Sequence, residues 1–521
     1  MSKLKGVVLI DGVHKPDNTI DGIKKLIKEF DFVPLKLVWL GGTEKMKSPS
    51  TFNEEFFKEF GVEVIMEGDP DDGISDPVSG IKKALKERDI DLVIQLSGSP
   101  QVNRDIMNRY ASIVVSYGAK YIAGGTVFAE KTGKSQAIKP SIGLYATDKR
   151  VGKTAFGVYI SKLMSGLGGY NTPWEAIVMT HSRGGPPSPP VVNIFNKHSL
   201  KPPEELTLED LYNSRFKPEY LERLLSFKLH GASDVYEDAL ILSHYMDIYE
   251  EKTGKSAPKI SVIGCRRAGA GYFHEFVVSN VELGLKASEI CPGNYILHEG
   301  SGGEHPPTRV DATITLVQSD INISLLKEFP GLDGTECIIL AHCQYETATV
   351  ETIEQVEKAL KERNPSLPVI RTYFEPEIIG DVNNVRKEVE GKKIMYLGTA
   401  PKKVKDKLLY SLEKNYGCNV VASSFDLARD DLMRYDIDEA MKEEKPEIFL
   451  IEIKARGVEG AKYIREKYGS PCKYLNNIPV EVDKEGNQIK GNVNLDETIL
   501  EALNRGVVRF NKRTEKNFPV L

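Results

Sequence analysis

The segment 141–154 constrains the fold more than any other part of the chain. A short apolar strand at 142–145 runs into a tight loop, and a helical pattern begins directly after Gly152, Lys153 and Thr154. Strand, loop and helix in this order are typical of a phosphate-binding loop, in which backbone N–H groups and the helix N-terminus surround an anion. The segment therefore predicts an α/β core that carries a nucleotide site.

The loop offers the residue types that bind ATP and magnesium. Lys153 is expected to reach the terminal phosphates, and the Thr154 hydroxyl to ligate Mg²⁺. One position departs from the common motif, because Thr147 stands where a glycine is usual. The predicted ATP-binding residues are Thr147, Asp148, Lys149, Arg150, Val151, Gly152, Lys153 and Thr154.

Charge and apolar content argue against two classes of protein. The formal net charge is −6, whereas a general nucleic-acid-binding protein would show a basic surplus. No apolar run approaches the length of a membrane span, and the chain opens with a strand at 7–10 instead of a signal peptide. The six cysteines have no paired spacing, which favours reduced, buried thiols in a cytoplasmic protein. We expect no nucleic-acid or membrane partner. The oligomeric state stays open, with a homodimer as one option.

Alternating strand and helix patterns divide the chain into three units, residues 1–137, 138–390 and 391–521. Such alternation predicts mostly parallel sheets with helices on both faces. The predicted fold class is therefore α/β, with a P-loop NTPase core and its parallel sheet flanked by N-terminal and C-terminal α/β domains. Residues 187–259 or so form a helical insertion in the core, either a lid or an oligomer contact. The tail at 512–516 is expected to fray.

Four loops of the second unit follow strands and carry residues that bind anions or metals. Besides the phosphate loop, they contain Arg183, the pair Arg266 and Arg267, and Glu299 followed by glycines. Taken singly, each is as readily an ordinary glycine-rich turn with a solvated charge. The carboxyl ends of parallel strands meet at one edge of a sheet, so the four loops are expected to line one cleft. A basic cleft in an acidic protein indicates a small, highly anionic substrate.

Individual roles follow from this arrangement. Glu299 is the candidate acid that holds or orients Mg²⁺. Together with Lys153 and Arg183 it makes up the predicted catalytic set, and with Thr154 the predicted metal ligands. The predicted substrate-binding residues are Arg150, Arg183, Arg266, Arg267, Ser301, Asp11 and His14.

Three further groups have weaker patterns. Asp11 and His14 follow the first strand, where ligands of open α/β sheets often bind, but turn chemistry explains them equally well. His342 and Cys343 are too few for a zinc site, which favours packing at a strand end. Charged residues alternate at 452–456 after an apolar strand. They are either a solvated strand end or reach the cleft from the neighbouring domain.

Several segments together are similar to one superfamily. The loop 147–154 and the glycine-rich run 299–303 resemble those of dethiobiotin synthetase and its relatives. A closer resemblance, over nearly the whole chain, is to the archaeal cyclic 2,3-diphosphoglycerate synthetases. The matching segments are 9–14, 149–154, 183–186, 264–267, 299–307, 398–401, 416–418 and 477–480. The segments 183–186 and 264–267 are the specific ones, because dethiobiotin synthetase lacks them.

The resemblance implies an ATP- and Mg²⁺-dependent ligase that closes 2,3-diphosphoglycerate into its cyclic phosphoanhydride and releases ADP and phosphate. It also brings in K⁺ as a candidate cofactor. Two alternatives remain at this point. One is a related P-loop ligase or kinase that acts on another small anionic substrate. The other is a nucleotide-switched ATPase, which would require a partner surface or a cluster of Cys and His ligands.

Overall fold

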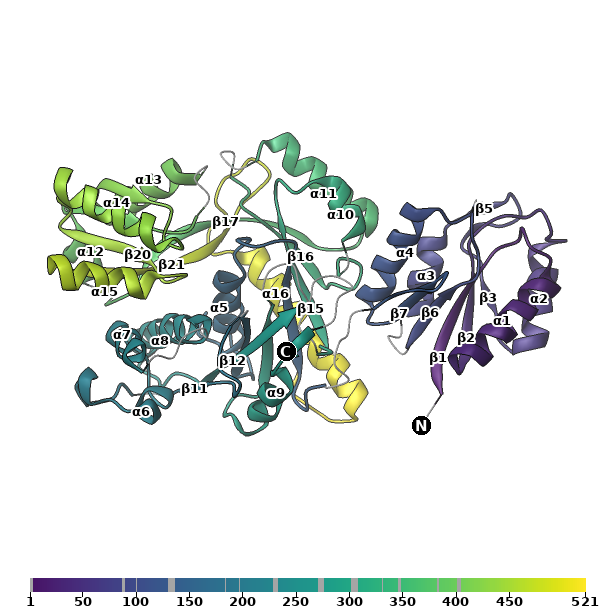
Figure 1. The fold of residues 1–521 in the computed structure, drawn as a ribbon, viewed down its shortest axis with the longest axis horizontal. Coiled ribbons are helices and arrows are strands. Elements are labelled where there is room, and N and C mark those ends of the chain that lie inside the picture. Colours follow the sequence, from purple (N-terminus) through teal and green to yellow (C-terminus); the bar gives the residue numbers. More distant parts are fainter. Residues whose placement is uncertain are drawn as a thin grey trace.

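The computed structural model shows three parts, with the N-terminal domain at one end of the molecule (Figure 1). It describes all residues except 1–2, 87–89, 100, 130–135, 183, 196, 228–232, 270–275, 301–307, 330, 345–347, 382–383 and 401–403. Two of the predicted site residues, Arg183 and Ser301, therefore lie outside the described residues.

The N-terminal domain is a six-stranded sheet in the order β3-β2-β1-β6-β7-β8, parallel except for β8. Its strands are β1 (Leu4–Ile10), β2 (Phe32–Trp39), β3 (Val64–Ile65), β6 (Leu92–Gln95), β7 (Lys120–Ala123) and β8 (Thr126–Phe128), with β4 (Gly68–Asp69) and β5 (Ile74–Ser75) forming a separate pair. The helices are α1 (Pro16–Phe30), α2 (Pro49–Phe60), α3 (Pro77–Leu85) and α4 (Arg104–Ser116). Separate apolar clusters cover the two faces of the sheet, as continuous apolar strands require.

One large sheet runs through the rest of the molecule in the order β11-β12-β10-β14-β9-β15-β16-β17-β21-β20-β18-β19. Its central half holds β9 (Ser141–Ala146), β10 (Ala176–Ser182), β11 (Val191–Ile194), β12 (Ile260–Gly269), β13 (Phe276–Ser279), β14 (Tyr295–Glu299), β15 (Ala312–Gln318), β16 (Cys337–Ala341) and β17 (Val369–Ile378). Strand β13 lies off the main order and pairs with β12. The helices here are α5 (Lys153–Met164), α6 (Leu208–Tyr212), α7 (Pro218–Ser226), α8 (Ser233–Thr253), α9 (Val281–Ile290), α10 (Ile323–Glu328) and α11 (Val350–Arg363), with a 3₁₀ turn at Pro203–Glu205.

The C-terminal half of this sheet forms a lobe of its own. Its strands are β18 (Lys393–Leu397), β19 (Asn419–Ser424), β20 (Ile448–Glu452) and β21 (Cys472–Glu481). Its helices are α12 (Val385–Val389), α13 (Lys405–Tyr416), α14 (Asp430–Glu443) and α15 (Gly457–Tyr468). A last helix, α16 (Val493–Thr514), follows β21. The fold is thus an α/β protein with a mixed, mostly parallel sheet, and the P-loop domain lies between the other two, as predicted.

Strand β17 joins the two halves of the large sheet end to end. Its first residues, 369–371, pair in parallel with β16, whereas 372–378 pair antiparallel with β21. Because β21, β20 and β18 are parallel to one another, the C-terminal strands run opposite to the central ones. The C-terminal half is attached to the carboxyl half of β17. The carboxyl edges of the two half-sheets therefore face each other.

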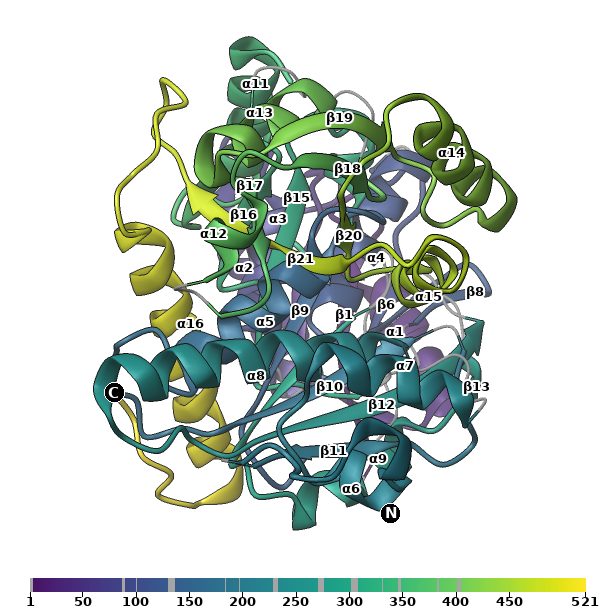
Figure 2. The same ribbon diagram turned by 90° about the vertical axis from the view of Figure 1, so that its left-hand side faces the viewer.

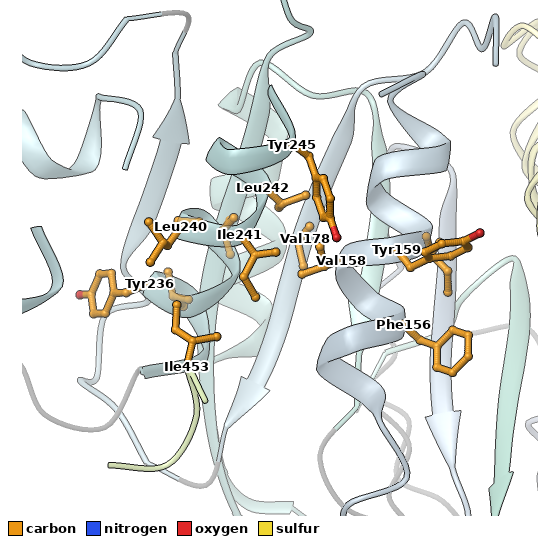
Figure 3. Close-up of a cluster of buried hydrophobic side chains, with 14 of the residues drawn as sticks. Phe156, Val158, Tyr159, Val178, Tyr236, Leu240, Ile241, Leu242, Tyr245 and Ile453 are labelled. Atoms are coloured by element: carbon orange, nitrogen blue, oxygen red, sulfur yellow. The ribbon is translucent and has the colours of Figure 1, made fainter. Parts of the chain in front are cut away.

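The segment 187–259, expected to be an insertion, contributes to the core. It contains β11 and the helices α6 to α8, and α8 packs against α5, β10, β11 and β12. Figure 3 shows the side chain of Ile241 of α8 pointing toward Val158 of α5, and both side chains are buried. In Figure 2, α8 lies across the molecule below the C-terminal lobe. This helix is therefore a layer of the central domain.

Helix α16 returns to the central domain and packs against β9, β15, β16 and α5. Its apolar residues recur every four positions at 495, 499, 503 and 507 and are buried, which is the spacing of an amphipathic helix. The expected fraying at 512–516 is not seen, because the Arg513 guanidinium donates to Asp311 Oδ1 at 2.5 Å. The third unit was expected to run to residue 521, whereas α16 covers the central sheet.

A buried ion cluster docks the N-terminal domain on the central domain. Asp333 accepts hydrogen bonds from Arg363 Nε at 2.9 Å and pairs with Lys82 Nζ of α3 at 2.9 Å. Ser116 Oγ, at the end of α4, accepts from the backbone N–H of Gly331 at 2.7 Å. Burial disfavours the charged form of Asp333, but the two cations outweigh it and lower its pKa to about 2.

Candidate nucleotide and active site

The phosphate loop leads from β9 into α5. Gly152 precedes the helix with φ +96°, and Arg150 also has a positive φ of +61°. No side chain of the described residues caps the helix N-terminus, and an uncapped helix start suits an anion. Lys153 Nζ reaches back across the loop to the backbone oxygen of Asp148 at 2.8 Å. The start of the loop is fixed by the Thr147 N–H, which donates to Leu316 O of β15 at 2.9 Å.

Two aromatic side chains hold the loop from the side of β16 and β17. The ring of Phe374 lies so close to Gly152 that a Cβ there would stand 2.1 Å from Phe374 Cζ. The same ring contacts Phe156 of α5 and His342 after β16, with centroids 5.6 and 5.1 Å away. His342 Nε2 lies 3.1 Å from the backbone oxygen of Arg150. His342 thus packs at a strand end, as predicted. Its contact there is with the phosphate loop.

A cavity of about 240 Å³ opens between the N-terminus of α5 and the loops of the C-terminal lobe. The central domain lines it with residues 150 and 152–155 of the phosphate loop and α5, together with His342, Gln344 and Phe374. The lobe lines it with residues that follow β18, residues of α13, and Glu452, Lys454 and Asn477. The charged side chains in the lining are Arg150, Lys153, Lys407, Lys454 and Glu452. The balance is positive, which suits a ligand of high negative charge.

Glu452 organises the lobe's side of the cavity. It is 2% exposed. Its Oε1 accepts from the Tyr396 hydroxyl and from Asn477 Nδ2, both at 3.0 Å. Its Oε2 accepts from the N–H and the hydroxyl of Thr399, at 2.7 and 2.9 Å. One buried carboxylate thereby ties the ends of β18 and β20 to β21, which fixes the loop that begins at Thr399.

Glu299 lies on the other side of α5. It ends β14 in register with Leu144 of β9 and Thr180 of β10, and it is buried. A Cβ on Gly157 would stand 2.8 Å from Glu299 Oε2. The carboxylate therefore packs against α5 one turn beyond Thr154, and Glu299 is not among the residues that line the cavity.

The two adjacent arginines point to opposite faces of the sheet. Arg266 shares a face with Ser182, its partner in register, and its Nη1 donates to Gly185 O at 3.2 Å. Arg267 follows it on an extended strand, so its side chain takes the other face, where it is 4% exposed. The structure thus brings Arg266 to the face that carries Glu299, and it does not bring Arg267 there.

A buried pair of histidines lies on the same face of the sheet as Arg267. His181 Nε2 and His298 Nδ1 are 3.3 Å apart. Burial lowers the pKa of both rings, to about 3 for His298. Both are therefore neutral at neutral pH. His298 lies in the buried strand β14, and a ring held neutral by burial with so low a pKa is a poor base.

Asp11 and His14 are distant in the fold from the phosphate loop, at the carboxyl end of β1 in the N-terminal domain. Asp11 is buried and accepts from the N–H groups of Val13 and His14 at 3.0 Å, and His14 Nδ1 lies 2.8 Å from its Oδ1. Burial acts to raise the pKa of Asp11, but hydrogen bonds from the side chain and the backbone N–H of His14 lower it. Neither residue lines the cavity.

Three residues of the site carried too little signal in the sequence. Phe374 looked like one more apolar strand residue, and Thr399 and Asn477 were noticed only through the resemblance. For Glu452 and Lys454 a signal existed, namely charges that alternate at the end of an apolar strand.

Within the described part of the chain, no group of three or more His, Cys, Asp or Glu residues is placed to hold a metal ion. Nor does any helix there have the length and apolar character to cross a bilayer.

Comparisons with known proteins match each part of this chain. The P-loop domain model of cyclic 2,3-diphosphoglycerate synthetase matches residues 141–373, the N-terminal domain model matches 5–129, and the C-terminal domain model matches 386–478. The cyclic 2,3-diphosphoglycerate synthetase of Methanothermus fervidus is 31% identical over 97% of this chain and 98% of its own. That of Thermococcus sibiricus is 30% identical over 95% and 97%. That of Rubrobacter xylanophilus is 28% identical over 93% and 96%.

Proposed function

This chain belongs to the cyclic 2,3-diphosphoglycerate synthetase family, and we propose that it is an ATP-dependent ligase that closes 2,3-diphosphoglycerate into cyclic 2,3-diphosphoglycerate. The observation that carries this proposal is the full-length match to the synthetase of Methanothermus fervidus, together with a P-loop domain match over 141–373 that contains the phosphate loop. ADP and inorganic phosphate are the other products.

The phosphate loop would hold the polyphosphate of ATP. The N–H groups at the start of α5 and the Lys153 ammonium group would bind the phosphate oxygens. Thr154 lines the cavity at the second position of α5, which suits its hydroxyl to ligate Mg²⁺ carried by the nucleotide. Mg²⁺ in such sites is bound by phosphates, waters and only one or two protein oxygens, so the lack of an acidic cluster among the described residues fits. When bound, it would neutralise charge on the phosphates.

Glu299 is the proposed acid that holds or orients this Mg²⁺ from beneath α5. Its burial against Gly157 leaves it little freedom, which suits an orienting role.

We assign no ligands to K⁺, which rests on the resemblance alone. A homodimer likewise stays a prediction, to be checked by analytical ultracentrifugation.

The substrate carries about four to five negative charges near neutral pH, because each of its two phosphomonoesters contributes roughly −1.5 to −2 and its carboxylate adds one more. Arg150 and Arg266 are described residues that would neutralise it, and Arg183, Ser301, Asp11 and His14 remain proposed ligands. Arg266 also fixes the loop beside Arg183 by its hydrogen bond to Gly185 O. Arg267 stays in the proposed set, but from the opposite face it would act through the packing of β12.

The reaction divides into two displacements. An oxygen of one substrate phosphate attacks the γ-phosphorus of ATP, and the bond to ADP breaks. An oxygen of the neighbouring phosphate then attacks the inner phosphorus of the new diphosphate, which closes the anhydride ring and expels inorganic phosphate. Lys153 and Arg266 would spread the charge that develops, since phosphoryl transfer depends mostly on positioning and electrostatics.

The test is ³¹P NMR of the purified protein with ATP, Mg²⁺ and 2,3-diphosphoglycerate. We expect the cyclic anhydride, ADP and phosphate in equal amounts, and almost none of them from Lys153→Ala at unchanged thermal stability. ATP turnover that needs no acid would instead favour a nucleotide-switched ATPase. Turnover with a different phosphorylated acid, but not with this one, would favour a related ligase or kinase.

A further inference from the structure

The C-terminal lobe has a crevice where its sheet changes direction. Strand β18 leads through α13 to β19 on one side, whereas its other neighbour, β20, leads through α15 to β21. Buried residues of α13 and of α15 pack on opposite faces of the lobe's sheet. The loops after β18 and β20 therefore diverge, and ligands of open α/β sheets bind at such switch points.

This crevice opens toward the phosphate loop. Thr399 and Ala400 follow β18, Glu452 ends β20, and Lys454 follows it, and all four line the cavity at the start of α5. The cause is the geometry of β17, which turns the carboxyl edges of the two half-sheets toward each other. One cavity thus has a phosphate loop on one wall and a switch-point crevice on the other.

Lys454 is the cation best placed on the second wall. It is half-buried, and within the described residues its ammonium group makes no hydrogen bond or ion pair. Two neighbouring cations, Lys407 and Arg456, each have a partner. Lys407 lies over the Tyr373 ring, 4.8 Å from its centroid. Arg456 pairs with Asp430 at 3.5 Å.

Among the described residues that line the cavity, Glu452 is the one carboxylate, and it makes no ion pair with Lys454. Both oxygens of Glu452 are already engaged by the donors of Tyr396, Asn477 and Thr399. A half-buried ammonium with no anion of its own favours an anionic ligand, because desolvation strengthens the attraction. Lys153 stands across the same cavity.

We infer that the C-terminal lobe forms the second half of the nucleotide site, with Lys454 binding the polyphosphate of ATP from the wall opposite Lys153. This inference rests on the proposed ATP-dependent function. It assigns the lobe a direct part in nucleotide binding, and Glu452 a positioning role through Thr399 and Asn477. A cation that reaches the phosphates from a facing domain is an arrangement that phosphoryl transfer uses elsewhere.

The experiment is calorimetric titration of the full-length protein with ATP, with ADP and with 2,3-diphosphoglycerate. Lys454→Ala and Lys454→Gln should lower the affinity for ATP about 10- to 100-fold, the effect of one charged hydrogen bond. The affinity for 2,3-diphosphoglycerate should be unchanged, and Lys454→Arg should recover part of the ATP affinity. The matched control is Lys462→Ala on α15, an exposed lysine 3.7 Å from Glu466, which removes the same charge from the same lobe.

Three results would overturn the inference: unchanged affinity for ATP in both variants, an equal loss in Lys462→Ala, or a loss confined to 2,3-diphosphoglycerate. Thermal unfolding of each variant identifies a misfolded protein, and Lys454→Gln, which retains most of the side chain, then carries the test. Binding is measured without turnover. A protein that forms no cyclic product would therefore refute the proposed function, while the ATP titrations would still report on Lys454.

Discussion

The ring of Phe374 occupies the space that any side chain at Gly152 would need. A Cβ at Gly152 would lie 2.1 Å from Phe374 Cζ, and the backbone there has φ +96°. Phe374 belongs to β17, the strand that joins the two half-sheets. The phosphate loop therefore packs directly on the element that positions the C-terminal lobe.

Gly152→Ala should displace the phosphate loop. The positive φ and the overlap with the ring together should lower the free energy of unfolding by about 2–4 kcal/mol. ATP turnover should fall by at least about 100-fold, since small displacements of catalytic groups have effects of that size. Urea unfolding and steady-state kinetics measure the two effects.

The control for this prediction is Gly169→Ala. Gly169 also has a positive φ, +92°, but nothing lies within 4 Å of a Cβ there. It should show the backbone strain alone and keep its activity. In the double variant with Phe374→Ala the ring no longer overlaps, so part of the ATP affinity should return. Equal behaviour of the two single glycine variants would show that Phe374 does not constrain the loop.

The phosphate loop was the most predictable part of the molecule because its signals are local. Segment 141–154 contains strand, glycine and helix start in consecutive order, and the structure places β9 at Ser141–Ala146 and α5 from Lys153. The α/β fold followed from alternating apolar strands and amphipathic helices in the same way. Such patterns depend on neighbours in sequence.

Features that depend on distant residues could not be predicted. Strand β17 pairs over three residues with β16, about 30 positions earlier in the chain, and then with β21, about 100 positions later. That pairing decides that Phe374 meets Gly152 and that Lys454 faces the phosphate loop. The opposite faces of Arg266 and Arg267 were predictable in principle from strand periodicity. The sequence pattern predicts one basic loop for the pair, because β12 continues further than its apolar residues indicate.

Arg266→Ala and Arg267→Ala should separate binding from stability. Arg266 shares the face of Glu299, so its loss should weaken 2,3-diphosphoglycerate binding about 10- to 100-fold and ATP binding far less. Arg267 is buried on the opposite face, so its loss should lower the free energy of unfolding by about 2–3 kcal/mol. Calorimetric titration measures the binding of the two ligands, and urea unfolding measures the free energy of unfolding. Loss of substrate binding in a stable Arg267 variant would reverse the assignment.

Arg513→Ala should loosen α16 from the central domain. Asp311 is 4% exposed and also accepts from the N–H and hydroxyl of Ser141. Because Arg513 is a quarter exposed, we expect a loss of about 1–2 kcal/mol, near the low end for hydrogen bonds to charged groups. Arg513→Lys should recover only part, since an ammonium lacks the planar fork. The control is Lys512→Ala, which changes the exposed residue next to Arg513 and should leave thermal unfolding unchanged.

Asp333 should make the docking of the N-terminal domain dependent on pH. Its pKa is lowered to about 2 in the folded protein, against about 3.9 in an unfolded chain. A carboxyl with a depressed pKa stabilises the fold above its unfolded pKa, and that contribution is lost as the pH falls from about 4 to 2. Asp333→Asn should lower the free energy of unfolding at pH 7 by about 3–5 kcal/mol, because Lys82 and Arg363 lose the buried carboxylate that both contact.

The difference between the wild-type protein and Asp333→Asn should therefore shrink as the pH approaches 2, where the wild-type carboxyl is itself protonated. Urea unfolding at a series of pH values measures it. The matched control is Asp31→Asn, which removes an exposed carboxyl 3.7 Å from Lys3 and should change stability little at any pH. If the Asp333 difference stays constant from pH 7 to 2, the cluster acts through its hydrogen bonds and shape. In that case the charge of Asp333 does not hold the N-terminal domain against the P-loop domain.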